Sequence, residues 1–125
     1  MTQTKAGGQS DMNGWTDGVA YTDLEIVKNS YYASNTGEIR SYNGWDRTSK
    51  FVPCHGATSL SLPQSLGIDA CNWFFNEAGT AIRTFRFSNT GPSTVNVPAN
   101  AYTFGLSMSA TNLAKAIADG IIPNV

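Results

Sequence analysis

The chain has 125 residues, a formal net charge of −1 and a charged fraction of 14%, below the roughly 25% of an average soluble domain. This length suits one domain that buries a core without metal or disulfide staples. The eight Lys and Arg residues are scattered, which argues against a nucleic-acid-binding surface because such surfaces need clustered cations. No apolar stretch reaches the about 18 residues of a membrane span. Residues 1–8 lack an apolar core, so we expect no secretory signal peptide.

The N-terminal residues 1–14 are rich in Gly and contain no aromatic residue. Such a segment buries too little apolar surface to order itself, so we expect a flexible arm or linker. A single domain is then expected over residues 15–125. Its first half carries turn signals at Asp17-Gly18, 35–37 and Asn43-Gly44, and its apolar and aromatic runs predict strands over 24–28, 31–33 and 38–42. The polar residues 45–50 are interpreted as a loop-like approach to the next strand.

The second half of the domain shows the strongest strand pattern. A hairpin is predicted over 75–87, with a type I turn at 76–79 closed by Gly79 in the left-handed region. Its returning strand has a period of two rather than 3.6, and Pro98 ends a later strand because it lacks a ladder donor. Strands are predicted over 51–54, 58–62, 71–75, 80–87, 94–98 and 101–107.

The last segment has a helical pattern instead. Residues 110–119 are rich in Ala and place Leu113 and Ile117 at helical spacing, with Thr111 as the expected N-cap and Gly120 as the expected C-cap. Many short strands followed by one helix predict an all-β fold. The specific prediction is a jelly-roll-like antiparallel β-sandwich with one short C-terminal helix, and a closed barrel is the alternative.

No pattern in the chain indicates catalysis or a metal site. His55 is the only histidine, and its neighbour Cys54 would point to the opposite face of a strand, so a corner at 54–56 is the favoured interpretation. Cys54 and Cys71 match no zinc spacing, and two reduced cysteines are favoured over a disulfide. The nine carboxylates would give pairs at glycosidase separation by chance alone. We therefore predict no enzyme, no catalytic residues and no cofactor.

Aromatic residues are the best candidates for binding. A flat ring stacks on the apolar face of a sugar, while neighbouring polar groups bind its hydroxyls. One segment combines both kinds of group, and the predicted ligand site is Tyr42, Asn43, Trp45, Asp46 and Arg47. The competing interpretation is that such rings fill a core or a subunit interface. Core packing is favoured for Trp73 within its apolar run, whereas both interpretations stay open for Trp45.

Three motifs in the second half suggest a family. They are Phe51-Val52-Pro53-Cys54-His55-Gly56-Ala57-Thr58, Phe75-Asn76-Glu77-Ala78-Gly79-Thr80-Ala81-Ile82 and Val95-Asn96-Val97-Pro98-Ala99-Asn100-Ala101-Tyr102. Their order resembles the β-sandwich domains of tailed-bacteriophage structural proteins, such as tail fibres, baseplate-associated proteins and head fibres. The resemblance covers roughly residues 45 to 108. The family hairpin usually has Tyr-Asp before its turn where this chain has Phe75-Asn76, and no family ligand residue is carried over.

The resemblance implies a non-enzymatic virion component released by lysis. It would assemble with other virion proteins, either decorate a particle or bind a host-surface glycan, and form a homo-oligomer, with a trimer favoured. No nucleic acid or membrane insertion is expected. The alternative is a free-standing carbohydrate-binding module of a bacterial surface protein or enzyme, with Tyr42 and Trp45 as its platform. A small hydrolase is a third and weaker interpretation.

Overall fold

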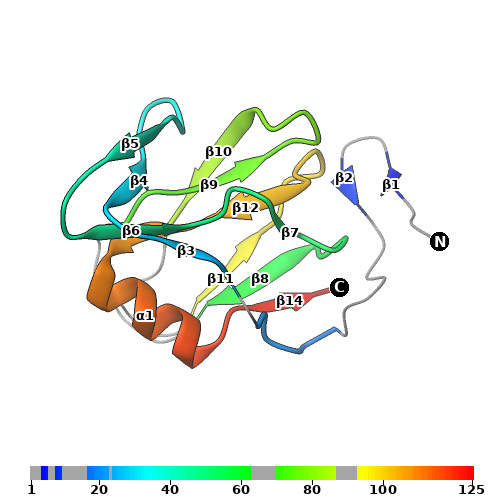
Figure 1. The fold of residues 1–125 in the computed structure, drawn as a ribbon. Helices are drawn as coiled ribbons and strands as arrows, with labels where there is room; N and C mark the ends of the chain where they lie inside the picture. Colours follow the sequence, from blue (N-terminus) through cyan, green and yellow to red (C-terminus); the bar gives the residue numbers. More distant parts are fainter. Residues whose placement is uncertain (1–3, 6–7, 10–16, 23, 63–69, 87–92) are drawn as a thin grey trace.

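The computed structural model describes residues 4–5, 8–9, 17–22, 24–62, 70–86 and 93–125. This part of the chain is built of short strands, with a single helix close to the C-terminus (Figure 1). In chain order the elements are β1 Thr4–Lys5, β2 Gly8–Gln9, β3 Ile26–Val27, β4 Ser30–Tyr32, β5 Ile39–Ser41, β6 Trp45–Thr48, β7 Val52–Pro53, β8 Ser59–Leu62, β9 Asn72–Phe75, β10 Ala81–Phe85, β11 Ser93–Asn96, β12 Thr103–Gly105, β13 Ser107–Ser109, α1 Ala110–Asp119 and β14 Ile122–Asn124.

Every strand pairing in these segments is antiparallel. The largest sheet has the order β10-β9-β12-β7, and two three-stranded sheets have the orders β11-β8-β14 and β13-β6-β3. The strands β4 and β5 form a separate hairpin, as do β1 and β2. The predicted all-β class with one short C-terminal helix is therefore confirmed, while the jelly-roll connectivity stays a prediction.

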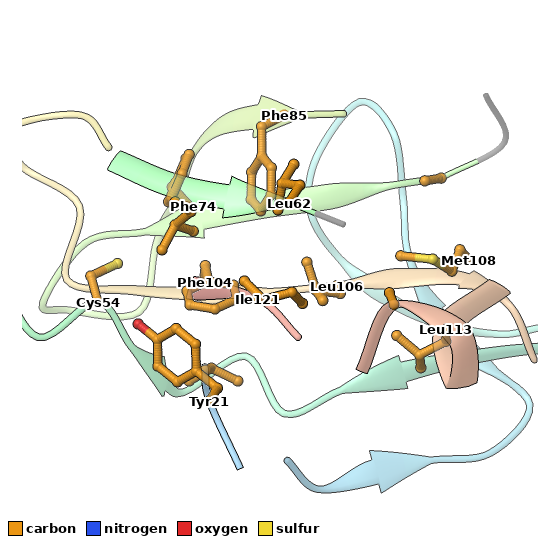
Figure 2. Packing of buried hydrophobic residues seen from close by; sticks show 14 of the residues in the cluster. Tyr21, Cys54, Leu62, Phe74, Phe85, Phe104, Leu106, Met108, Leu113 and Ile121 are labelled. Atoms are coloured by element: carbon orange, nitrogen blue, oxygen red, sulfur yellow. The ribbon is translucent and has the colours of Figure 1, made fainter. Parts of the chain in front are cut away.

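The main core lies where the four-stranded sheet and the β8 sheet meet the helix. Figure 2 shows Phe74 and Phe104 from the first sheet, Leu62 from the second and Leu113 from α1 gathered in one cluster. All four are at most 3% exposed. Burying one side chain of this size contributes about 1.5–3 kcal/mol, so this cluster is the chief source of stability. Two sheets that share one apolar interior make the arrangement sandwich-like.

A smaller core cluster fixes the β4–β5 hairpin against β9 and β10. It consists of Tyr32, Trp73 and Phe75, with Ala81 packed against it. The Trp73 indole N–H donates to the Ala33 carbonyl at 2.9 Å, so the one polar atom of this ring is satisfied inside the protein. The prediction that Trp73 belongs to the core is confirmed.

Residues 45–48, interpreted from sequence as loop-like, form strand β6, so that prediction was wrong. The strand pairs with β13 on one side and with β3 on the other. This strand lacks the alternation of hydrophobic residues that predicts a strand, because its inward side chains are polar yet buried. They are Asp46 and Thr48. Thr48 Oγ1 accepts from the Leu106 N–H at 2.9 Å and donates to the Ser49 carbonyl at 2.9 Å, so burial leaves it hydrogen-bonded.

The helix begins at Ala110, two positions earlier than the expected cap at Thr111 would allow. Ser109, not Thr111, is the N-cap, and its Oγ accepts from the Asn112 N–H at 3.3 Å. The expected C-cap is confirmed, because Gly120 has a φ of 96° and its N–H donates to the Ala116 carbonyl at 3.0 Å. The residues after the helix form β14, which pairs with β8.

The predicted hairpin over 75–87 is confirmed for the described residues, with one departure in its alternation. The Gly79 N–H donates to the Asn76 carbonyl at 2.9 Å, and Gly79 has a φ of 87°. A register shift between Ala81 and Arg83 interrupts the period of two that the sequence suggested.

In the proposed N-terminal arm the structure describes only β1 and β2, which pair with each other. The rest of residues 1–14, together with Trp15, lies outside the described residues. The flexible arm over 1–14 and the domain boundary at residue 15 stay predictions.

Candidate functional site

Three aromatic side chains, from two strands and the turn after a third, surround one hollow at the surface. Tyr31 lies on β4, Tyr42 directly follows β5, and Trp45 begins β6. Together with Cys71, which precedes β9, they are the described residues that line a space of about 320 Å³. This volume lies at the lower end of the range of small-molecule sites. We call this space the aromatic hollow.

The three rings stand at steep angles to one another. The ring centroids of Tyr31 and Tyr42 are 5.9 Å apart at an interplanar angle of 73°, and those of Tyr31 and Trp45 are 5.9 Å apart at 76°. Tyr42 and Trp45 are 6.2 Å apart at 90°. Steeply inclined ring pairs at these separations are stabilised beyond simple burial, so the rings support one another. They form a corner rather than a flat platform.

The turn that carries Tyr42 is held by Asn29, a residue that sequence reasoning missed. The Asn29 carbonyl accepts from the Tyr42 N–H at 3.0 Å, and its side-chain oxygen accepts from the Gly44 N–H at 3.2 Å. Asn29 itself has a φ of 56°, a left-handed conformation that Asn tolerates better than most residues. An Asn between two strand-like runs was the available signal for this turn.

An ion pair lies beside Tyr31 on the β4–β5 hairpin. Arg40 is the register partner of Tyr31, and its guanidinium donates to Glu38 Oε1 at 2.9 Å and 3.3 Å. The hydrogen bond and charge of Glu38 raise the pKa of Arg40, with a smaller contribution from Tyr31. Both side chains are exposed, so this pair contributes little to the free energy of unfolding and acts mainly on the local electrostatic field.

The structure separates the five predicted site residues. Tyr42 and Trp45 line the aromatic hollow, and Asn43 occupies the exposed turn between them. The alternation of β6 turns Asp46 to the other side of the strand, where its Oδ1 accepts from the Asn29 N–H at 3.1 Å. Arg47 Nε donates to Ser30 Oγ at 2.8 Å. Asp46 and Arg47 are thus committed to the fold around the site, and neither is among the described residues that line the hollow.

Asp46 instead faces a groove between α1 and the β3–β6 pair. The groove has a volume of about 440 Å³ and a mainly apolar lining. Lys28 Nζ lies 3.2 Å from Asp46 Oδ2 within it. The described lining residues are Ile26, Lys28, Asp46, Ala110, Leu113, Ala114, Ile117 and Ala118.

The corner predicted at residues 54–56 is confirmed. His55 and Gly56 both have positive φ, and the Ala57 N–H donates to the Cys54 carbonyl at 3.0 Å. The His55 ring stacks on Tyr21 with centroids 5.9 Å apart. Burial raises the pKa of the Cys54 thiol to about 12, which disfavours the reactive thiolate at neutral pH. Both cysteines are reduced in the structure, as the sequence favoured.

Within the described segments no group of three or more His, Cys, Asp or Glu side chains is placed to hold a metal ion. The one helix among these residues is too short to cross a bilayer. Comparison with known proteins finds no matching family model, no matching curated protein and no matching solved structure.

Proposed function

We propose that this chain is a non-enzymatic bacteriophage virion module that assembles with other virion proteins and binds a host-surface glycan at the aromatic hollow. The observation that supports binding most directly is the convergence of Tyr31, Tyr42 and Trp45, from β4, the turn after β5, and β6, on one open space. Tyr42 is 57% exposed, so burial in a core does not explain why its ring lies there. Solvent-exposed aromatic side chains held in this way are typical of sites for apolar ligand faces.

The rigidity of the site also supports binding. The turn carrying Tyr42 is fixed by three hydrogen bonds, two to Asn29 and one from the Trp45 N–H to the Tyr42 carbonyl at 3.3 Å. Contacts between the steeply inclined rings hold the rings themselves. A pre-organised site loses little conformational entropy when a ligand binds, which increases its affinity.

The virion assignment is supported by the resemblance and is compatible with the positions of its motifs. The three motifs fall on the connections β7–β8, β9–β10 and β11–β12, which belong to the two sheets of the main core. The aromatic hollow lies on β4, the residue after β5, and β6, outside those motifs. A scaffold shared with phage proteins would therefore carry a binding surface particular to this chain. A homo-oligomer, with a trimer favoured, belongs to the same proposal.

A glycan array tests the binding part of the proposal. The protein should bind a subset of bacterial surface glycans, and Tyr42→Ala should weaken that binding at least about tenfold without changing the circular dichroism spectrum. Phe51→Ala is the matched control, because Phe51 is also an exposed aromatic residue, at 65%, but lines a different hollow. Equal binding by wild type and Tyr42→Ala would contradict the proposed site.

Mass spectrometry of purified virions, together with light scattering of the isolated protein, tests the assembly part. We expect the chain in the particles and a stable oligomer in solution. Saturable glycan binding by a monomer that is absent from particles would favour the free-standing carbohydrate-binding module instead.

A further inference from the structure

We infer that the aromatic hollow binds a quaternary ammonium group, the trimethylammonium of a choline-type ligand. This inference rests on the proposed function because it takes the same hollow as the ligand site. It then specifies which group of the ligand enters the hollow. The argument depends on the relative orientation of the three rings, on the space between them and on the charges at the rim.

The ring orientation argues against simple stacking on an extended sugar chain. Stacking along several units of an extended chain needs several coplanar rings, so that each sugar unit meets a flat face. Here the interplanar angles are 73°, 76° and 90°, so no two of the three rings are coplanar. Rings at such angles enclose a compact convex group from several sides.

The ring separations match the distance at which a cation binds to aromatic faces. In an ideal corner of three mutually perpendicular rings with centres about 6 Å apart, one point faces all three rings at about 4.2 Å from each centre, which is the separation divided by the square root of two. The observed separations of 5.9–6.2 Å and angles of 73–90° are close to those of such a corner. A cation within about 6 Å of a ring centroid is attracted by the negative face of the ring. One trimethylammonium group at that point would contact Tyr31, Tyr42 and Trp45 together.

The charges around the hollow permit a cation to enter. The described lining consists of three aromatic residues and Cys71, none of which carries a formal positive charge at neutral pH. The nearby Arg40 is paired with Glu38 at 2.9 Å, so the pair adds no net charge at the rim. The methyl groups on the nitrogen lower the free-energy cost of removing the cation from water. They also make the group large enough to reach all three rings.

The test is titration of the full chain with choline chloride, followed by NMR of the Trp45 indole and by calorimetry. We expect saturable binding with a Kd on the order of 1 mM. The neutral carbon isostere of choline, dimethylbutanol, has the same shape without the charge and should bind at least about tenfold more weakly. Tyr42→Ala should weaken choline binding about tenfold, while Tyr42→Phe and Phe51→Ala should leave it within about twofold. Tyr42 is exposed, so these variants leave the core intact.

Two results would overturn the inference: no binding of choline up to about 50 mM, or equal binding of choline and its neutral isostere. Glycan binding that depends on Tyr42 but is unaffected by choline would also overturn it and would leave the proposed function standing. Choline binding by a protein absent from virions would support the inference while removing the virion assignment. Phosphatidylcholine vesicles and a choline-substituted polysaccharide, compared as competitors, then identify the source of the group.

Discussion

Gly105 lies where the main core meets the smaller core cluster, and its replacement by Ala is predicted to be costly. A Cβ at this position would lie 2.6–2.8 Å from three atoms at the end of the Tyr32 ring. Gly105 is not among the glycines with positive φ, so its backbone itself accepts an L residue. The cost is therefore steric, and it depends on whether Tyr32 can move.

Tyr32 has little freedom to move. It is 0% exposed, its hydroxyl donates to the Thr48 carbonyl at 2.6 Å, and its ring packs on Phe75 with centroids 5.6 Å apart. Overpacking a core costs about 1–3 kcal/mol, and loss of the buried hydrogen bond adds about 1 kcal/mol. We expect Gly105→Ala to lower the free energy of unfolding by about 2–4 kcal/mol, which corresponds to a fall in Tm of about 10 °C.

Urea denaturation of a double-mutant cycle measures this cost. In a Tyr32→Leu background, where the obstructing ring is gone, Gly105→Ala should cost less than about 1 kcal/mol. Gly18→Ala is the control, because Gly18 has a φ of +79° and nothing within 4 Å of an added Cβ, so its cost should be the same in both backgrounds. A Gly105→Ala cost that is near zero, or unchanged by Tyr32→Leu, would refute the steric argument.

Three further predictions concern the helix cap, alkaline pH and the thiols. Ser109→Ala should lower the free energy of unfolding by about 1 kcal/mol in urea titrations and Thr111→Ala by clearly less, and equal effects would contradict the assigned N-cap. Burial raises the pKa of Cys54 and of Tyr32 to about 12 from ordinary values of 9.0 and 10.0, so both groups ionise more readily in the unfolded chain. The free energy of unfolding should be constant below about pH 9 and fall between about pH 9 and pH 12, by up to about 1.4 kcal/mol per pH unit for each group. Cys54→Val should move the onset of this fall to about pH 10, and an unchanged onset would contradict the reasoning. A thiol reagent should modify half-buried Cys71 in the native protein but Cys54, at 1% exposure, only after unfolding, and similar rates by mass spectrometry would count against this.

Most strands could be predicted because they are apolar runs bounded by turn residues. The strands β8 and β9 carry apolar residues between turn signals, and Gly79 and Gly120 end their elements as their conformational freedom suggests. Strand β6 escaped prediction because it is buried through hydrogen-bonded polar groups. Periodicity of hydrophobic residues cannot reveal a strand whose inward residues are Asp46 and Thr48.

The candidate site could be predicted only in part, for a related reason. The sequence drew attention to the segment of Tyr42 and Trp45 because aromatic and polar residues are neighbours there. Once that segment is a strand, consecutive residues point to opposite sides, which places Asp46 in the helix groove and Trp45 in the aromatic hollow. Tyr31 and Cys71 reach the site through tertiary contacts, and no local sequence pattern predicts that they lie there.

The β4–β5 hairpin rests on the smaller core cluster of Tyr32, Trp73 and Phe75, apart from the main core. Segments supported by different clusters can open to solvent independently, each with its own free energy. Amide hydrogen exchange should therefore record the β4–β5 hairpin and the body of the domain as separate units. A ligand in the hollow should slow exchange in β4, β5 and β6 and leave β8, β11 and β14 unchanged, which would locate the occupied surface without any substitution.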